Sequence, residues 1–327
     1  MSVDLGEFKF IESVLKKSLP MGEGTPASRG WLPVGDDCAM FDGWLVTKDL
    51  SVEGTHFRMD WSSPEQAVEK HIVSNVSDIS AMGGVPKFAV CGICMNKAWS
   101  EDIRKRVGVA FAEGFARRGI ALIGGDTVAG DCGMFSTTLL GTCVGDKPLV
   151  RSGARPGDDV YVAGTLGKSA AGLWILLNHP EMAEEFPALV GYHLAPAIDE
   201  RCGESLVKLG VDGACMDISD GLSSELNHIA GASHVGIEID CEKIPVDAEV
   251  LRLCERFSLD PLEFTLNGGE EYELLFTKTC KNDIFLEKDA LSGGVFRIGT
   301  VVENPGVRMR CQDGNVKSVK AQAWSHL

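Results

Sequence analysis

The sequence predicts an α/β protein, in the wider α+β sense, that is built from two domains. Three observations support this. The chain has 327 residues, apolar strand-like segments alternate with amphipathic helix-like segments, and the alternation starts again after a turn at Lys147-Pro148. Single domains usually contain about 100–150 residues, so this length favours two of them. We therefore expect one domain at residues 1–147 and a second at residues 148–327.

The first domain is expected to alternate helices and strands. Apolar periodicity and capping residues predict helices at Glu7–Leu19, from Ser63-Pro64 through Ile79, and at Ser100–Arg118. Short apolar runs predict strands at Trp44–Thr47, Lys87–Met95, Ile120–Ile123 and Met134–Val144. Glycine-rich Pro20–Gly30 is expected to be a flexible loop. Asp49 and the Gly124–Asp126 motif are thereby placed at the carboxyl ends of strands.

The second domain is expected to continue the same alternation. The pattern predicts strands at Val160–Ala163, Ile237–Asp240, Tyr272–Phe276 and Phe296–Val301, and helices at Ser169–Leu177 and Gly221–Ala230. No internal repeat or low-complexity segment interrupts it. Alternating strands and helices are typical of layered α/β architecture.

The charge of the chain disfavours several classes of partner. Its 31 basic and 47 acidic residues give a formal net charge of −16, which opposes nonspecific binding to nucleic acid or to an anionic membrane. No apolar run is long enough to cross a membrane and the first residues lack a signal-peptide pattern, so we expect a cytoplasmic protein. The 11 cysteines are an odd number and lie mostly in apolar segments, which indicates reduced thiols.

Six short acidic motifs are the main functional signal. Each lies beside glycine or at the end of an apolar run: Gly35–Asp37, Thr47–Asp49, Asn75–Asp78, Gly124–Thr127, Asp217–Gly221 and Gly268–Glu271. Taken singly, each is typical of a turn or a helix cap. If the fold gathers them, each carboxylate pair repels by about 4 kcal/mol at 4 Å at an effective dielectric constant of 20, so cations are required. Oxygen ligands suit Mg²⁺, which commonly binds together with phosphate.

Three other motifs do not carry the chemistry they superficially suggest. Gly164–Ser169 lacks the first glycine of a phosphate-binding P-loop, because Val162 occupies that position. Asp217–Gly221 lacks the remaining ligand spacing of an EF-hand. Cys91 and Cys94 would face opposite sides of a strand and have no second cysteine pair with which to bind zinc, so core packing is favoured.

The acidic motifs, with their order and spacing, resemble the thiamine-monophosphate kinase family. The resemblance runs from Gly6–Phe8 to Trp324–Leu327 and rests on Gly35–Ala39, Asp49, Glu53–Phe57, Asn75–Gly83, Gly124–Thr127, Arg151–Ala154, Asp217–Leu222 and Leu266–Leu274. That family belongs to a group with aminoimidazole ribonucleotide synthetase, selenophosphate synthetase and a hydrogenase-maturation dehydratase. The resemblance implies a two-domain aminoimidazole ribonucleotide synthetase-like fold. It also implies a homodimer in which the N-terminal domains pair into a β-barrel.

The resemblance further implies roles for individual residues. The Mg²⁺ ligands would be Asp37, Thr47, Lys48, Asp49, Asp78, Asp126, Asp217 and Asp220. The ATP contacts would be Gly125, Asp126, Arg151 and Ser219, and the residues that hold thiamine monophosphate would be His56, Glu270 and Trp324. Lys48 departs from the family, which commonly has a small hydroxyl residue there, so only a backbone carbonyl ligand would survive at this position.

The implied reaction is the Mg²⁺-dependent transfer of the ATP γ-phosphate to thiamine monophosphate, which gives thiamine diphosphate and ADP. Such a transfer needs positioning and charge neutralisation, and the acceptor phosphate is already ionised near neutral pH, so no general base is assigned. Glu270 and Trp324 would suit the cationic thiazolium ring. Two alternatives stay open: another ATP-using member of the group, of the selenophosphate synthetase or hydrogenase-maturation type, and a non-enzymatic Mg-nucleotide-binding module.

Overall fold

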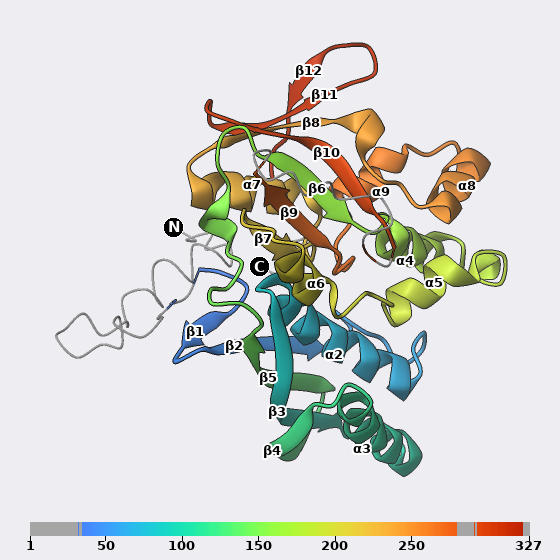
Figure 1. Cartoon of the computed structure of the whole chain (residues 1–327). Helices are drawn as coiled ribbons and strands as arrows, with labels where there is room; N and C mark the ends of the chain where they lie inside the picture. Colours follow the sequence, from blue (N-terminus) through green and yellow to red (C-terminus); the bar gives the residue numbers. More distant parts are fainter. Residues whose placement is uncertain (1–31, 33–34, 280–290, 292, 323–327) are drawn as a thin grey trace, which may run out of the picture.

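The computed structural model describes residues 32, 35–279, 291 and 293–322, which form two β-sheets with helices packed around them (Figure 1). The predicted helix at Glu7–Leu19, the predicted loop at Pro20–Gly30 and the predicted substrate residue Trp324 lie outside the described residues. Among the helices that are described, none is long and apolar enough to span a membrane.

The first sheet has five strands in the order β1-β2-β5-β3-β4. They are β1 (Ala39–Phe41), β2 (Trp44–Val52), β3 (Gly84–Asn96), β4 (Ala121–Gly130) and β5 (Met134–Cys143). Only β3 and β4 pair in parallel; the other neighbours are antiparallel. Helices α2 (Pro64–Ala81) and α3 (Glu101–Ala116) pack against one face of this sheet (Figure 1). Side chains alternate between the faces of a strand, so half of them point to the opposite side.

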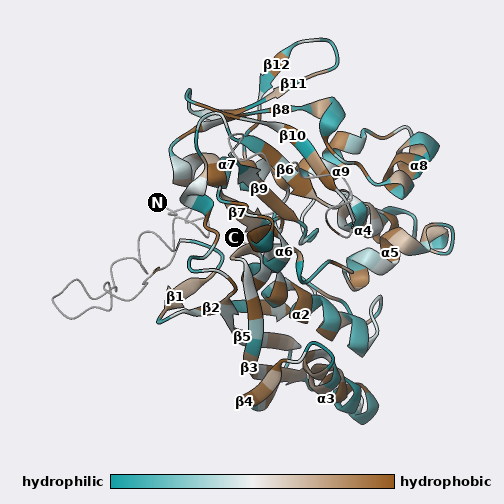
Figure 2. Ribbon diagram, in the orientation of Figure 1, coloured by the Kyte–Doolittle hydropathy of each residue, from teal (hydrophilic) through white to brown (hydrophobic). Residues whose placement is uncertain are grey.

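We call that opposite side the open face. Apolar side chains on it remain exposed in the described chain, among them Leu50, Val90, Val128 and Met134. Part of β4, the edge strand, is coloured hydrophobic in Figure 2. A sheet of this type normally solvates a polar face, so an apolar open face is typical of an interaction surface.

The second sheet has seven strands in the order β12-β11-β8-β10-β6-β9-β7. They are β6 (Asp159–Ala163), β7 (Cys215–Asp217), β8 (Gly236–Asp240), β9 (Leu274–Lys278), β10 (Val295–Val302), β11 (Gly306–Arg310) and β12 (Val316–Ser318). Helix α7 (Leu222–Ser233) packs on one face, where Leu226 shares a buried core with the strand residues Val160 and Ile237.

Smaller helices surround the second sheet. They are α4 (Lys168–Asn178), α5 (Pro187–Leu194), α6 (Cys202–Lys208), α8 (Ala248–Phe257) and α9 (Pro261–Asn267), with short 3₁₀ helices η4 (Arg151–Gly153), η5 (Pro180–Met182) and η6 (Cys241–Lys243). Helices α4, α5, α8 and α9 share a core of their own, in which Ile175, Leu189 and Leu253 are buried. Helix α6 packs with β7 and β9 around Leu206 and Phe276.

Helix α2 connects the two sheets. Its start is fixed by a capping box, in which the Ser63 hydroxyl accepts a hydrogen bond from Gln66 N at 3.2 Å and Gln66 Oε1 accepts one from Ser63 N at 2.9 Å. On the side of the second sheet, Gly203 N donates to Ser80 Oγ at 3.1 Å, and a side chain at Gly203 would collide with the backbone of Ser80. Residues of α2 are therefore presented to both halves of the chain.

The structure confirms the predicted mixture of strands and helices and corrects several positions. Asp49 does not follow a strand, because β2 continues to Val52; likewise Gly124–Asp126 lies within β4, which continues to Gly130. Both segments are held by ladder pairing with neighbouring strands, which overrides their weak strand propensity. Tyr272 precedes β9 and does not belong to it. The short elements β1, β7, β11, β12, α5, α6, α8 and α9 were not predicted.

Candidate functional site

Three carboxylates from distant parts of the chain come together where α2 meets the second sheet. Asp37 lies just before β1, Asp78 lies on α2 and Asp217 ends β7; one oxygen from each lies within 4.8 Å of the others. Asp37 and Asp217 are buried and Asp78 is half-buried. We call these three residues the acid cluster. Three of the six acidic motifs therefore converge, which sequence spacing alone could not establish.

Hydroxyl groups orient two members of the acid cluster. Thr47 Oγ1, on β2, donates a hydrogen bond to Asp78 Oδ2. Ser77 Oγ donates to Asp217 Oδ2 at 2.6 Å and so links α2 to β7. Both carboxylates are thus held in fixed orientations by neutral donors, which leave their negative charge uncompensated.

Arg151 is the cation next to the acid cluster. Its guanidinium donates to Asp37 Oδ1 from Nε at 3.1 Å and also from Nη2, and its backbone N donates to Asp36 Oδ2 at 3.1 Å. Asp37 Oδ2 is buried and has no hydrogen-bond partner within the described part of the chain. One guanidinium therefore faces several carboxylates, and an oxygen of Asp37 stays available to a ligand.

The electrostatics of this site favour a bound cation. Burial, followed by repulsion from Asp37, raises the pKa of Asp217 to about 8 and that of Asp36 to about 7. Burial also raises the pKa of Asp78 well above its ordinary value, and the charges of Asp49, Asp217 and Asp37 add to that shift. A cation among these oxygens would reverse such shifts, and an all-oxygen donor set fits Mg²⁺.

Strand β2 divides its predicted ligands between the two faces of the first sheet. Thr47 and Asp49 lie on the face covered by α2, where Asn75 Oδ1 accepts a hydrogen bond from Asp49 N at 3.3 Å. Lys48 lies on the open face, where its ammonium donates to Ser136 Oγ. Thr47 and Asp49 therefore border the acid cluster, whereas the Lys48 side chain points away from it.

The predicted residues Gly125 and Asp126 are not brought to the acid cluster within one chain. Strand β4 is three strand spacings from β2, which corresponds to about 14 Å. In the ladders Asp49 is opposite Thr137, which is opposite Cys91, which is opposite Gly125. Asp126 is the next residue along β4, so its side chain lies on the open face.

Residues Ser219 and Asp220 form a turn between β7 and α7. Glu270 N donates to Ser219 O at 2.7 Å, and Tyr272 N donates to Ile218 O at 2.8 Å. The segment around Glu270 therefore lies directly against this turn. Both Glu270 and Tyr272 have positive φ, at 63° and 55°, which is rare for residues other than glycine and is frequent at functional sites. The fifth and sixth acidic motifs, Asp217–Gly221 and Gly268–Glu271, thus meet.

A partly buried ion pair holds the side chain of Glu270. Lys70 Nζ, on α2, donates to Glu270 Oε2 at 2.6 Å, and its side chain is only 7% exposed. His193 Nδ1, on α5, lies 3.6 Å from the same oxygen. Burial and the charge of Lys70 lower the pKa of His193 well below its ordinary value, so its imidazole is neutral. The charge of Glu270 is therefore already balanced by Lys70.

The predicted substrate residue His56 lies in the turn after β2. Its Nδ1 accepts a hydrogen bond from Val52 N at 3.1 Å. Glu53 stabilises the same turn by accepting bonds from Trp99 Nε1 at 2.9 Å and Gly133 N at 2.9 Å. His56 is half-buried and belongs to the first sheet, whereas Glu270 belongs to the second half.

Comparison with known proteins matches both halves of the chain. Residues 35–146 match the N-terminal domain of AIR synthase related proteins, and residues 155–312 match their C-terminal domain. The thiamine-monophosphate kinase of Aquifex aeolicus (strain VF5) is 35% identical over 332 residues, which cover 99% of both chains. The chain belongs to the thiamine-monophosphate kinase family. A solved family structure, AaThiL complexed with AMPPCP and TMP, superimposes with a TM-score of 0.83 at 34% identity and covers 99% of this chain and 97% of its own.

The match confirms the predicted two-domain AIR synthase-related fold. A more distant structure, the HypE–HypF complex, has a TM-score of 0.69 at 20% identity and covers 95% of this chain and 99% of its own. That likeness concerns the fold alone. The hydrogenase-maturation alternative therefore gains no support, whereas the family of thiamine-monophosphate kinases is matched over the full length.

Sequence reasoning missed two buried polar residues of the candidate site, Lys70 and Glu225. Lys70 lies among buried α2 residues, and Glu225 is only 1% exposed on α7. A signal existed for Glu225, since an acid four residues after a glycine at a helix start can reach back to cap the preceding turn. Nothing in the spacing of Lys70 indicates that a residue 200 positions away would pair with it.

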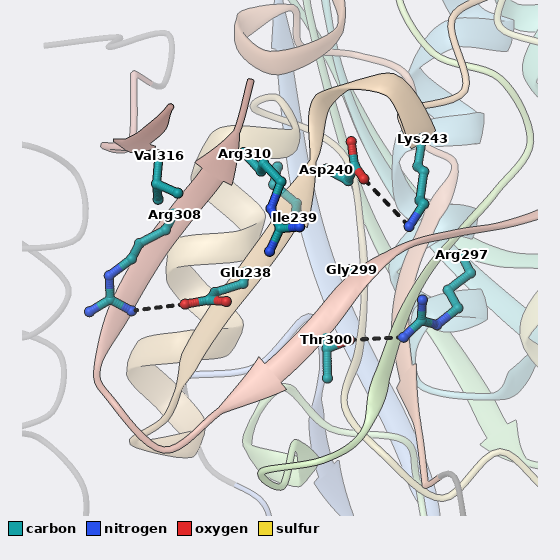
Figure 3. A pocket seen from close by; sticks show the side chains of 10 residues that line it. All are labelled: Glu238, Ile239, Asp240, Lys243, Arg297, Gly299, Thr300, Arg308, Arg310 and Val316. Carbon is teal, nitrogen blue, oxygen red and sulfur yellow. Dashed lines mark hydrogen bonds and ion pairs between the residues drawn. The ribbon is translucent and has the colours of Figure 1, made fainter. Parts of the chain in front are cut away.

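A separate groove lies on the second sheet over β8, β10 and β11 (Figure 3). It has a volume of about 160 Å³. Its polar contacts are between Arg308 and Glu238 at 4.0 Å, Lys243 and Asp240 at 3.4 Å, and Arg297 and Thr300 at 2.9 Å. Strand β8 is four strand spacings, about 19 Å, from β7. The charged side chains of this groove mostly pair with each other, so we assign the groove no part in the candidate site.

Proposed function

We propose that this protein catalyses the ATP-dependent phosphorylation of thiamine monophosphate to thiamine diphosphate by direct in-line transfer. The observation that carries the proposal is the convergence of Asp37, Asp78 and Asp217, each from a motif that resembles the family. Family membership over the full length supports the acceptor, and the solved relative with AMPPCP and TMP supports the pair of substrates. The reaction is the last step in making thiamine diphosphate.

We propose Mg²⁺ as the cation that this site binds. Several such ions would be held by Asp37, Thr47, Lys48 through its backbone, Asp49, Asp78, Asp217 and Asp220, whereas Asp126, on the open face, would bind a cation away from the acid cluster. When bound, Mg²⁺ supplies neutralisation of the phosphate charges and orients donor and acceptor oxygens. The raised pKa values of Asp78 and Asp217 support this assignment, since burial of uncompensated carboxylates is costly without a cation.

The remaining polar residues would bind and orient the substrates. The guanidinium group of Arg151 would donate hydrogen bonds to a phosphate oxygen of ATP. Gly125, Asp126 and Ser219 would be the other nucleotide contacts. His56, Glu270 and Trp324 would hold thiamine monophosphate. Lys70 already pairs with Glu270, so the thiazolium ring would meet a balanced ion pair and not an isolated carboxylate. No side chain is assigned as a general base.

We propose that residues 1–147 and residues 148–327 form two domains with different roles in the site. The first part would supply most metal ligands and the dimer contact, because it contains Asp37, Asp78 and the open face. The second part would complete the nucleotide and acceptor sites through Ser219 and Glu270. Contacts such as Ser77 with Asp217 support a site shared by both parts.

We propose that the protein is a homodimer in which the open faces of two first sheets pair as a β-barrel. The exposed apolar residues Leu50, Val90 and Val128 support this, because they would lose their contact with water. Lys48 and Asp126 would then lie at the interface. We also propose a cytoplasmic location, which suits ATP use and the ten free thiols among the described residues.

The test is chromatography of a reaction that contains the purified protein, Mg-ATP and thiamine monophosphate, with thiamine as a parallel acceptor. We expect thiamine diphosphate and equimolar ADP from the monophosphate alone. The Asp78→Asn variant serves as the matched control, because it removes one charge at nearly constant volume. Mg-ATP binding without any product would favour a nucleotide-binding module and would contradict the proposal, as would a different phosphorylated acceptor.

A further inference from the structure

We propose that Glu225 positions the Ser219–Asp220 turn for nucleotide binding without touching the substrates. The inference deepens the proposed function and rests on it. Glu225 Oε1 accepts a hydrogen bond from Ser219 N at 3.1 Å and a second from Asp220 N at 2.7 Å. One carboxyl oxygen thus accepts hydrogen bonds from two consecutive backbone amides, which belong to the residues proposed to contact ATP and metal.

The start of helix α7 explains why a glutamate is needed here. Gly221 is the N-cap residue and provides no side chain to cap the helix, and its φ of 119° lies in the region that favours glycine. The acid four residues later reaches back over the first turn of α7 to the two amides before Gly221. This extends the usual capping box, in which an acid at the third helical position bonds the cap residue itself. Without that acceptor, two amides in a crowded turn would lose their partner.

The opposite side of the turn is fixed by the segment that carries Glu270. Ser219 O accepts a hydrogen bond from Glu270 N at 2.7 Å. A side chain at Gly269 would place its Cβ only 2.6 Å from Ser219 O, so the two segments are in close backbone contact. Both backbone polar groups of Ser219 are therefore used, one by Glu225 and one by the Glu270 segment. Removing Glu225 releases one of these two restraints.

The length of the Glu225 side chain, and not its charge, is the property that this geometry requires. Its second oxygen, Oε2, is buried and has no hydrogen-bond partner in the part of the chain that the structure describes. Glutamine keeps an acceptor at Oε1 and places its amide nitrogen where Oε2 lies. Aspartate keeps the carboxylate but is one methylene shorter, so it cannot reach both amides. The two variants therefore separate positioning from charge.

The experiment compares Glu225→Gln, Glu225→Asp and Glu225→Ala in the full chain. Isothermal titration measures the Kd for Mg-ATP, and steady-state assays measure kcat and both KM values. We expect the Kd of Glu225→Gln for Mg-ATP to stay within about threefold of the parent value. The aspartate and alanine variants should raise this Kd about 10- to 100-fold, because the two backbone amides lose their acceptor. Ser100→Ala is the control, since Ser100 caps α3 by accepting from Ile103 N at 3.2 Å away from this turn; its Kd should not change.

Two results would overturn the inference. Parent-like Mg-ATP binding in all three variants would show that the turn is held without Glu225. A Glu225→Gln variant as impaired as alanine, with a functional Glu225→Asp, would assign the effect to charge. If circular dichroism shows that Glu225→Ala does not fold, the comparison of Glu225→Gln with Glu225→Asp still distinguishes positioning from charge. Failure of the proposed kinase activity is distinguishable, because the parent protein would then bind Mg-ATP but form no thiamine diphosphate.

Discussion

The acid cluster and the open face of the first sheet both contain predicted metal ligands, but a single chain completes only one of them. Asp37, Asp78 and Asp217 come from three segments, are largely buried and lie within 4.8 Å of one another. Asp126 lies on the exposed edge strand β4, where its Oδ1 accepts a hydrogen bond from the neighbouring Thr127 N at 2.8 Å. The contrast shows that motif resemblance predicts ligands without stating whether one chain or two must assemble them.

The two regions also differ in what stabilises them. The acid cluster opposes folding through repulsion and burial of charge, and is held by hydroxyl donors and Arg151. The open face leaves apolar side chains such as Val128 in water. A cation would stabilise the first region, and a second copy of the chain would stabilise the second. Each of the following predictions tests one side of this comparison.

The largest expected effect is that of Asp78→Asn in the acid cluster. Loss of this carboxylate should lower kcat about 100- to 1000-fold, because it removes charge that would hold metal and phosphate in place. The same change should raise the melting temperature of the metal-free protein, since it removes repulsion between buried carboxylates. Steady-state assays and calorimetry in EDTA measure the two effects. The exposed Asp131→Asn variant is the control, and parent-like kcat in Asp78→Asn would contradict the metal assignment.

The next largest effect is expected for the buried pair of Lys70 and Glu270. Lys70→Met leaves the half-buried Glu270 unpaired beside neutral His193 and should cost up to about 3 kcal/mol of unfolding free energy. It should also raise the KM for thiamine monophosphate more than that for ATP. Denaturant unfolding and steady-state kinetics measure these changes.

A matched pair on the surface provides the control for Lys70→Met. Lys97 and Asp131 lie 3.0 Å apart but are both well exposed, so Lys97→Met should cost at most about 1 kcal/mol. The double variant Lys70→Met with Glu270→Gln should recover part of the lost stability, because the unpaired charge is removed. Equal losses of unfolding free energy in Lys70→Met and Lys97→Met would mean that water screens the Lys70–Glu270 pair as it screens the surface pair.

On the open face, Val128→Glu should prevent dimer formation and lower kcat/KM about tenfold or more, because a residue that the proposed interface would bury becomes charged. Val128 is 55% exposed in the described chain. Light scattering with size-exclusion chromatography measures the mass. Leu177→Glu, at a comparably exposed site on α4, should leave both mass and activity unchanged. A parent protein that is monomeric at assay concentration would contradict the dimer and leave the acid cluster unaffected.

Much of this fold could be predicted from local sequence, whereas the arrangement of the site could not. The capping box at Ser63 and the amphipathic pattern after it give α2 directly, because both signals lie within a few residues. Asp49 and Gly124–Asp126 were misplaced at strand ends because ladder partners on β5 and β3 extend their strands, and partners are not local information. The Lys70–Glu270 pair and the convergence of Asp78 with Asp217 depend on packing across long separations.

The smallest expected effect is a pH dependence of stability to which Asp217 of the acid cluster contributes. Burial raises the pKa of Asp217 to about 8 in the folded protein, whereas an unfolded aspartate has a pKa of about 3.9. The folded state therefore binds more protons than the unfolded state at intermediate pH, and its stability must fall as pH rises through the folded pKa. Burial lowers the pKa of His71 to about 3 and that of His228 to about 4, so their contributions lie below about pH 6.5.

Measured in EDTA, the unfolding free energy should therefore decrease by about 1–2 kcal/mol between roughly pH 6.5 and pH 8.5. Excess Mg²⁺ should remove most of this slope, because the cation then takes the place of the protons among the carboxylates. Asp217→Asn should reduce the slope measured in EDTA, whereas Val128→Glu should leave it unchanged, since Val128 lies on the open face away from the acid cluster. A slope that persists in excess Mg²⁺ would assign the titration to buried acids outside the acid cluster, such as Glu271, whose pKa burial also raises to about 8.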